Sequence, residues 1–457
     1  MGMMQLSEAV SAVRAQRIGD DVIFDAVTTD SRSASAGDLF VALHGEHFDG
    51  HQFIGVAAQH GAVAAMVQSD IQHPLPQLVV ANTRLALGQL AGYWRERFLI
   101  PMVAITGSNG KTTVKEMLAS ILRAATANDR QPMGAETVLA TQGNLNNDIG
   151  VPLTLLKLRD SHRYAVVEMG MNHRGEIDYL SRLAKPDVAL INNAHAAHLE
   201  GLGSVQQVAL AKGEIFAGLK NSGVAVINAD DPNAALWREL TVGRRVLDFG
   251  LRNPAQVHAD YRLQAWGSQV SITTPAARIA TELRVCGLHN VYNALAATAA
   301  ATALDVNRQA IAAGLALFSG VKGRLQRHAG LNGATFIDDT YNANPASVQA
   351  ALQVLAACAG KKIFVLGDMG ELGSAAVQLH AGIGEQARNC GVDVMYALGE
   401  LSGHAVRQFG RGALHFETIA QLLAELENVL APDVTVLVKG SRFMKMERVV
   451  RSFTSET

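Results

Sequence analysis

Cysteine is scarce in this sequence. There are three cysteines among 457 residues, Cys286, Cys358 and Cys390. They are scattered, odd in number and form no Cys-x-x-Cys pair, which argues against both a disulfide framework and a structural zinc site. We therefore expect free, buried thiols in a reducing compartment.

The sequence also lacks long apolar runs and runs of basic residues. No window of about 18 uninterrupted apolar residues occurs, and Glu8 and Arg14 interrupt the amino-terminal segment before an apolar core of signal-peptide length develops. Lys and Arg are not interleaved with aromatic residues, and the net charge is -2, so we expect no nucleic acid partner. These absences predict no membrane insertion and a cytoplasmic location.

Short apolar runs alternate with helical stretches along the whole chain. With 49% hydrophobic and 18% charged residues, the composition is typical of globular proteins, and the length exceeds what one hydrophobic core usually supports. We expect an α/β protein of three domains: a small amino-terminal α/β module over 1–98, a central doubly wound, mostly parallel sheet over 99–318, and a Rossmann-like α/β domain over 319–457.

Several elements are predicted individually. Residues 87–98 predict a helix, the polar and apolar alternation over 257–279 predicts an antiparallel ribbon, and the alanine-rich run 290–304 predicts another helix. The polar segment 126–141, which contains Pro132 and Gly134, predicts a mobile loop. Apolar runs predict strands at 22–24, 39–43, 78–80, 103–105, 164–167, 188–191, 224–227, 335–337, 362–366, 394–398 and 434–438.

The most informative stretch is Thr-Gly-Ser-Asn-Gly-Lys-Thr-Thr at 106–113. It follows an apolar run and opens a helical pattern, so a strand, a glycine turn and a helix start form a phosphate cradle. Lys111 adds a mobile charge, and Thr112 offers a hydroxyl to Mg²⁺. Ile105 stands where the full P-loop pattern has glycine, so the turn is a shortened variant. The motif predicts ATP binding; the alternative is an ordinary glycine turn. The expected nucleotide contacts in this stretch are Gly107, Ser108, Asn109, Gly110, Lys111, Thr112 and Thr113.

Glu168 directly ends a predicted strand and is followed by Met-Gly. Mg²⁺ bound to a nucleotide needs hard oxygen ligands from more than one element, so beside a phosphate cradle Glu168 is a candidate metal ligand. The alternative is a solvated turn residue. His195 and His198 also follow a predicted strand and are three residues apart. A zinc site would need further ligands at metal spacing, and loop or capping histidines are the other interpretation.

Lys212 lies in a largely apolar helical stretch. Such a lysine is commonly a surface residue whose stem covers apolar neighbours. If it is desolvated instead, it loses its proton more readily and can take up CO₂, which turns a cation into a long carboxylate able to bind Mg²⁺. The sequence alone leaves both interpretations open.

Several separated motifs together resemble one family, the ATP-dependent Mur ligases of peptidoglycan synthesis, whose nucleotide turn also reads Thr-Gly-x-x-Gly-Lys-Thr. The resemblance spans essentially the whole chain. Within the family, the Asn-rich tract 143–152 and the tracts 337–345 and 438–442 resemble the member that joins D-alanyl-D-alanine to UDP-N-acetylmuramoyl-tripeptide. The other matching tracts are 29–32 and 37–43, which in such ligases belong to a UDP-binding domain, and 168–170, 198–204, 211–214 and 287–294.

The resemblance implies a role for each matching residue. Lys111 would bind phosphate, Thr112 and Glu168 would bind Mg²⁺, His198 would contribute to a second Mg²⁺, and Lys212 would be carbamylated; His195 receives no role. Across the next domain boundary, Arg324 would bind the γ-phosphate. Helix capping is the alternative for Asn290, a surface ion pair for Arg324, and turn formation for the asparagines. The remaining implied contacts are Asn290 with the base, Asp339 with the ribose, Tyr341 and Asn342 nearby, and Ser31, Asn144, Asn146 and Asn147 with the muramoyl substrate.

The implied reaction completes the muramoyl-pentapeptide precursor. The tripeptide carboxylate attacks the γ-phosphorus of ATP, and the amine of D-alanyl-D-alanine then displaces phosphate from the acyl phosphate. Carboxylates do not acylate amines unaided, and Mg²⁺, Lys111 and Arg324 would offset the repulsion between two anions. Domain closure at hinges near 98 and 319 would align the reactants and exclude water. We expect a monomer.

Two other functions remain open at this stage. One is a related ligase that adds a free amino acid to an earlier muramoyl peptide or to a folate-like acceptor; the Asn-rich tract and the Thr-Asp-Ser-Arg segment argue against it. The other is a nucleotide-gated binding or regulatory protein with little ATP turnover. Glu168, Lys212 and Arg324 together favour turnover.

Overall fold

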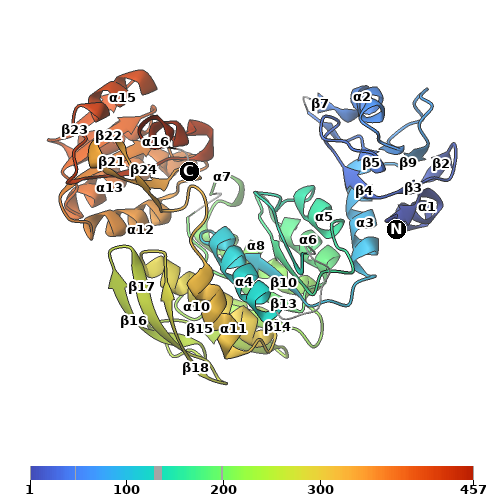
Figure 1. Ribbon diagram of the computed structural model, residues 1–457, viewed down its shortest axis with the longest axis horizontal. Helices are drawn as coiled ribbons and strands as arrows, with labels where there is room; N and C mark the ends of the chain where they lie inside the picture. The colour runs from blue at the N-terminus through green and yellow to red at the C-terminus, as the bar shows by residue number, and fades with distance from the viewer. Residues whose placement is uncertain (1, 47, 128–135, 197–198, 456–457) are drawn as a thin grey trace.

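The computed structural model describes residues 2–46, 48–127, 136–196 and 199–455. Its elements form three α/β bodies, each built around one large sheet, and the amino-terminal and carboxy-terminal bodies rise from two sides of the central one (Figure 1). The predicted α/β class is confirmed. The domain boundaries near 98 and 319 stay predictions; residue 98 lies between α3 and β10, and residue 319 between α11 and β19.

The amino-terminal body holds a five-stranded sheet in the order β2-β9-β8-β5-β4. β2 pairs with β9 antiparallel, and the other neighbours are parallel. Helix α3 starts earlier than predicted because the Asn82 side chain accepts from the Leu85 backbone N–H at 3.0 Å and caps it. The elements are β1 Met4–Gln5, α1 Leu6–Val13, β2 Gln16–Ile18, β3 Ile23–Phe24, β4 Ala26–Thr28, β5 Asp38–Val41, β6 His44–Gly45, β7 Phe48–Asp49, α2 Ile54–Gln59, β8 Ala64–Val67, β9 Gln77–Val79 and α3 Thr83–Arg95.

The central body is a six-stranded parallel sheet in the order β11-β12-β10-β13-β14-β15. Side chains alternate along β10: Val103 and Ile105 join the core with α4 and α10, while Met102 and Ala104 join the core with α3 and α6 on the other face. Burial on both faces explains why the strands read as continuous apolar runs. The elements are β10 Met102–Thr106, α4 Lys111–Ala125, β11 Val138–Ala140, α5 Gly150–Leu155, β12 Tyr164–Glu168, α6 Glu176–Ala184, β13 Val188–Ile191, α7 Leu199–Leu202, α8 Val205–Gly213, β14 Val224–Asn228, α9 Ala234–Leu240 and β15 Arg245–Phe249.

A three-stranded antiparallel sheet and two helices complete the central body. The ribbon predicted over 257–279 is confirmed as β16 His258–Gln264, β17 Gly267–Thr273 and β18 Arg278–Leu283. The predicted alanine-rich helix is α10 Leu288–Ala303, followed by α11 Arg308–Leu317. The loop predicted over 126–141 is wrong at its end, because residues 138–140 pair with β12 as edge strand β11; residues 128–135 lie outside the described ranges.

The carboxy-terminal body contains the sheet β19-β20-β24-β21-β22-β23, parallel except for the pairing of β19 with β20. The carboxyl ends of β20, β21 and β24 carry the loops that face the central body. The elements are β19 Gln326–Ala329, β20 Thr335–Asp339, α12 Pro345–Ala356, β21 Lys361–Gly367, α13 Ala376–Asn389, β22 Val394–Leu398, α14 Ser402–Phe409, β23 Ala413–Phe416, α15 Ile419–Glu427, β24 Val434–Lys439 and α16 Glu447–Phe453.

The cysteines and the helices bear on two further predictions. All three cysteines are free, and Cys286 and Cys358 are buried as expected, whereas Cys390 is half-buried. Within the described ranges, no helix combines the length and apolar character that crossing a membrane requires.

Candidate active site

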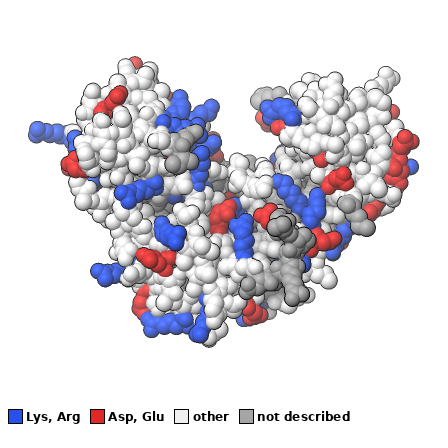
Figure 2. Space-filling model, viewed as in Figure 1, with Lys and Arg blue, Asp and Glu red and all other residues white. Residues whose placement is uncertain are grey.

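A cleft of about 980 Å³ opens between the central and carboxy-terminal bodies. Figure 2 shows a hollow between the carboxy-terminal and amino-terminal bodies, above the central body, with Lys and Arg side chains along it. Acidic side chains, including Glu168 and Asp339, line the cleft between the central and carboxy-terminal bodies. A cleft that mixes both signs of charge suits anionic substrates held with metal ions. Its cationic lining residues are Arg84, Lys111, Arg252, Arg324, Lys439 and Arg442.

The phosphate turn connects β10 to α4 on the floor of this cleft. Gly110, the residue before the helix, has φ 78°, and a Cβ there would lie 2.4 Å from Asn293 Oδ1, so glycine is required on both counts. Because Gly110 has no side chain, the backbone N–H groups of the first turn of α4 have no side-chain cap from this residue. The helix start therefore faces the cleft with its positive end, as the motif predicts.

Lys111 and Thr112 occupy the first turn of α4. The Lys111 ammonium donates to the Gly107 carbonyl at 2.8 Å. Burial lowers the pKa of Lys111, although the charge of Glu168 opposes that shift. The Thr112 hydroxyl donates to Glu168 Oε2 at 2.9 Å. Glu168 is therefore a buried residue at the end of β12 and not a solvated turn residue.

Glu168 also connects the phosphate turn to the Asn-rich tract. Its second carboxylate oxygen, Oε1, accepts from Asn146 Nδ2 at 2.8 Å, and its backbone N–H donates to Thr141 Oγ1 at 2.9 Å. Asn147 also forms a turn, which was the alternative role for these asparagines, because its side chain accepts from the Gly150 N–H at 2.8 Å. Asn144, Asn146 and Asn147 all line the cleft.

Three buried asparagine side chains form a directed hydrogen-bond chain behind the turn. Asn290 Nδ2 donates to the Cys286 carbonyl at 2.8 Å, Asn293 Nδ2 donates to Asn290 Oδ1 at 3.0 Å, and Asn192 Nδ2 donates to Asn293 Oδ1 at 3.0 Å. Asn192 Nδ2 also donates to the Asn109 carbonyl at 3.0 Å. Because both ends of the chain are backbone carbonyls, the orientation of every amide is determined. Asn290 is not the helix cap, since Gly287 holds that position.

Lys212 is 1% exposed in α8, so the surface interpretation is wrong. Burial lowers the pKa of Lys212 well below its usual range, and the nearby charge of Lys111 lowers it further. Desolvation favours the neutral amine, which is the form that reacts with CO₂. His195 lines the same cleft, and burial lowers its pKa. His198 lies outside the described residues.

The donor set around the turn suits a magnesium ion shared with phosphate. Thr112 and Glu168 place two hard oxygens side by side from two different elements. Among the described residues, no group of three or more His, Cys, Asp or Glu could hold a metal by itself. Mg²⁺ commonly takes only one or two protein ligands and completes its shell with nucleotide oxygens and water, so these two residues fit it.

The carboxy-terminal wall of the cleft is built around Arg324 and the loop after β20. The Arg324 guanidinium lies 4.3 Å from the ring centre of Tyr341, and its Nη2 is 3.5 Å from Thr112 Oγ1. Its Nε is buried without a partner among the described residues. The surface ion-pair interpretation of Arg324 does not describe this environment, which is a stacked cation facing the phosphate turn.

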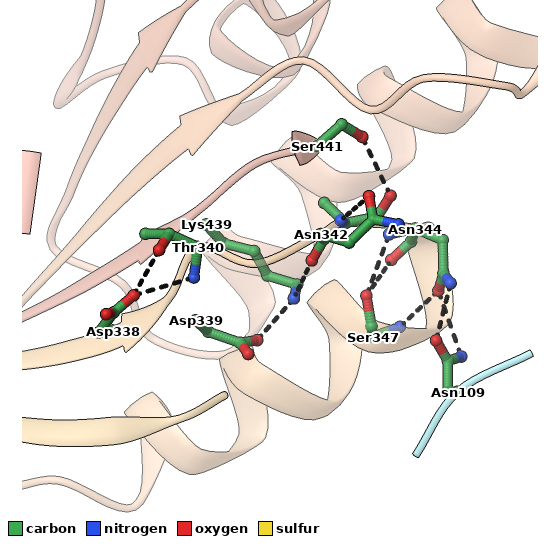
Figure 3. A network of polar contacts seen from close by, with 10 residues as sticks. Asn109, Asp338, Asp339, Thr340, Asn342, Asn344, Ser347, Lys439 and Ser441 are labelled. Carbon is green, nitrogen blue, oxygen red and sulfur yellow. Dashed lines mark hydrogen bonds and ion pairs between the residues drawn. The ribbon is translucent and has the colours of Figure 1, made fainter. Parts of the chain in front are cut away.

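Asp339 forms a buried ion pair with Lys439 (Figure 3). The Lys439 ammonium donates to Asp339 Oδ2 at 2.6 Å and to the Asn342 carbonyl at 2.9 Å. Burial lowers the pKa of Lys439 and raises that of Asp339, and the attraction between the two opposes both shifts. Tyr341 and Asn342 line the cleft beside this pair.

The structure does not bring every predicted site residue together. Ser31 lies in the amino-terminal body, where its carbonyl is 2.9 Å from His60 Nδ1, and it is not part of the cleft lining. Residues that sequence reasoning missed include Asn192, Asn293 and Asn344, which hold the turn or face it. Asn293, Asn344 and Lys439 lay within the matching tracts but received no role there. Their polar side chains within those tracts were the available signal.

Comparison with known proteins covers nearly the whole chain. Family models described as the Mur ligase middle domain, the Mur ligase glutamate ligase domain and the Mur ligase family catalytic domain match residues 105–301, 323–442 and 24–95. The UDP-N-acetylmuramoyl-tripeptide--D-alanyl-D-alanine ligase of Escherichia coli is 41% identical over 98% of this chain and 97% of the relative. The ligase of the same name from Haemophilus influenzae is 42% identical over 98% of each.

Solved structures agree with the sequence matches. A crystal structure of MurF from Acinetobacter baumannii superimposes with a TM-score of 0.91 and 38% identity, covering 99% of both chains. MurF from Thermotoga maritima in complex with ADP gives a TM-score of 0.81 at 28% identity, over 93% of this chain and 96% of that one. A folylpolyglutamate synthase from Mycobacterium tuberculosis, at 18% identity and a TM-score of 0.64, shares the fold.

Proposed function

Since the chain belongs to the Mur ligase family, we propose that it is the ATP-dependent ligase that joins D-alanyl-D-alanine to UDP-N-acetylmuramoyl-tripeptide in peptidoglycan precursor synthesis. The observation that carries the proposal is the Glu168 carboxylate, which is hydrogen-bonded to Thr112 of the phosphate turn and to Asn146 of the Asn-rich tract. One carboxylate therefore joins the nucleotide motif to the tract that resembles the member adding D-alanyl-D-alanine. Full-length relatives carrying that activity in their names support the same substrate pair.

The reaction begins with the tripeptide carboxylate attacking the γ-phosphorus of ATP, which forms an acyl phosphate and ADP. Lys111 and Arg324 offset the repulsion between the two anions, because Lys111 belongs to the phosphate turn and Arg324 approaches that turn from the carboxy-terminal body. The amine of D-alanyl-D-alanine then attacks the acyl carbon, and phosphate leaves from the tetrahedral intermediate. Exclusion of water by domain closure, with hinges near 98 and 319, protects the acyl phosphate from hydrolysis.

Thr112 and Glu168 would hold one Mg²⁺, which would supply charge neutralisation at the transferred phosphoryl group. Lys212, once carbamylated, and His198 would contribute to a second Mg²⁺. The burial and lowered pKa of Lys212 support the carbamate, since the neutral amine is the reactive form. The carbamate would also replace a costly buried cation with a charge paired to metal.

The remaining residues would contact the nucleotide and the muramoyl substrate. Asn290 contacts the base, Asp339 the ribose, and Tyr341 and Asn342 complete the nucleotide site. Asn144, Asn146 and Asn147 bind the muramoyl peptide on the central wall, and Ser31 binds the UDP end in the amino-terminal body. We further propose that the enzyme acts as a monomer in the cytoplasm.

The decisive test is a product analysis. The protein is incubated with ATP, Mg²⁺, UDP-N-acetylmuramoyl-tripeptide and D-alanyl-D-alanine, and the product is identified by mass spectrometry. We expect the mass of the pentapeptide with one phosphate released per bond formed. Phosphate release with single amino acids in place of the dipeptide would instead indicate a related amino-acid ligase, and absence of any turnover would indicate a binding protein.

A further inference from the structure

Asn109 of the phosphate turn and Asn344 of the carboxy-terminal body form a reciprocal pair of amide hydrogen bonds (Figure 3). Asn344 Nδ2 donates to Asn109 Oδ1 at 2.7 Å, and Asn109 Nδ2 donates to Asn344 Oδ1 at 3.3 Å. The two residues are 235 positions apart in the sequence. The pair therefore fastens one body to the other at the phosphate turn itself.

The central body orients the Asn109 side chain toward its partner. The Asn109 backbone N–H donates to Asn193 Oδ1 at 2.8 Å. Its carbonyl accepts from Asn192 Nδ2 at 3.0 Å and from Asn193 Nδ2 at 3.1 Å. With its backbone groups held by two neighbouring amides of the same body, Asn109 presents its side chain to the carboxy-terminal body.

Asn344 is held just as firmly on the other side. It is the N-cap of α12: its Oδ1 accepts from the Ser347 N–H at 2.9 Å, and its own N–H donates to Ser347 Oγ at 3.0 Å. The preceding loop is fastened to the end of β24, because Lys439 donates to the Asn342 carbonyl and Ser441 Oγ donates to the Ala343 carbonyl at 3.3 Å. Both amides are thus pre-organised, which reduces the entropy lost on pairing.

We propose that Asn344 is a positioning residue for phosphoryl transfer, which acts by clamping the carboxy-terminal body onto Asn109. The inference rests on the proposed function. Arg324 belongs to the same body as Asn344, and its Nη2 lies 3.5 Å from Thr112 Oγ1, three residues along from Asn109. The clamp sets the distance at which the Arg324 guanidinium meets the terminal phosphate of ATP. Asn344 itself touches no reacting atom.

The test is a double-mutant cycle in the full-length enzyme with Asn344→Ser and Asn109→Ala. Serine keeps the helix cap but its side chain is too short to reach Asn109. Two amide hydrogen bonds of ordinary strength predict that each single variant lowers kcat/KM for ATP roughly five- to tenfold. The double variant should be no more than about twofold slower than the worse single variant, because both changes break the same pair. The KM values for the tripeptide substrate and the dipeptide should stay close to those of the wild type.

The control is Asn307→Ser, which makes the same change at another asparagine N-cap, that of α11, outside the cleft lining. It should match Asn344→Ser in thermal unfolding and the wild type in kcat/KM. Wild-type or higher activity in Asn344→Ser, or losses that multiply in the double variant, would overturn the clamp. Failure of the proposed function is distinguishable, because the wild-type enzyme would then form no pentapeptide product.

Discussion

The two walls of the cleft are assembled differently. On the central wall, the contacts around Glu168 join residues that are fairly close in sequence: Thr112 and Glu168 are 56 positions apart, and Asn146 and Glu168 are 22 apart. The bond between Asn192 and Asn293 behind the turn spans 101 positions, but both residues belong to the same body. On the carboxy-terminal wall, the ion pair of Lys439 with Asp339 joins residues 100 positions apart, and the pair of Asn344 with Asn109 joins residues 235 positions apart. The first wall is a property of one folded body, whereas the second exists only when two strand ends and two bodies are in register.

Lys111→Ala should break the central wall most severely. Removing the cation that faces the phosphate turn should lower ATP turnover about a thousandfold, at the upper end of what one transition-state contact contributes. Phosphate release measures the rate, and circular dichroism should show an intact fold. An unchanged rate would remove the argument for a phosphate cradle.

Lys439→Met tests the second wall through stability. It leaves the Asp339 carboxylate buried without its partner, which should reduce the free energy of unfolding by about 3 kcal/mol. Urea denaturation provides the measurement. Adding Asp339→Asn should restore much of the loss, because a neutral amide is cheaper to bury than a carboxylate. Equal stability of the single variant and the wild type would show that the pair is dispensable.

Lys212→Ala tests the central wall at a second position, a buried lysine in α8 of the central body. Activity should fall about a hundredfold, as for lost support of a metal site. High bicarbonate should not restore activity, whereas a short-chain carboxylic acid that fills the vacated space should restore part of it. Full activity of the variant in a phosphate-release assay would dismiss the carbamate.

His289, at the junction of the two walls, should produce the smallest effect. Burial and the charge of Lys439 lower the pKa of His289 to about 4. The unfolded chain therefore binds a proton below pH 6.5 that the folded protein does not, so stability falls as the pH drops from about 6.5 to about 4. The slope should be less than about 1.4 kcal/mol per pH unit. Denaturant titrations of the wild type and His289→Gln should differ in this slope, and identical slopes would contradict the shift.

The same contrast explains what the sequence could predict. The parallel central sheet, the phosphate turn and the position of Glu168 follow from apolar runs and a short motif, because strand ends, turn and helix start are local. Family resemblance supplied Arg324 and Asp339, which local patterns could not. The family predicted from the sequence motifs, the Mur ligases, is confirmed by the comparisons with known proteins.

The missed features depend on long-range packing. Edge strand β11 was mistaken for loop because three residues beside a polar segment carry little pattern. The burial of Lys212 could not be read from its apolar helix, since the same pattern suits a surface lysine. The partners of Asn192 and Asn344 are set by how distant segments meet, which no spacing in the sequence encodes.

The directed chain of asparagine amides means that the phosphate turn cannot be transplanted as a peptide. An engineer who grafted residues 106–113 onto another strand and helix would carry over Gly110 but leave behind Asn192, whose amide holds the Asn109 carbonyl. Replacing Asn192, Asn290 or Asn293 by aspartate would place a carboxylate oxygen against the acceptor oxygen to which the amide Nδ2 now donates. The conformation of the turn therefore depends partly on side chains of α10, a helix that begins at Leu288, far along the sequence from the motif.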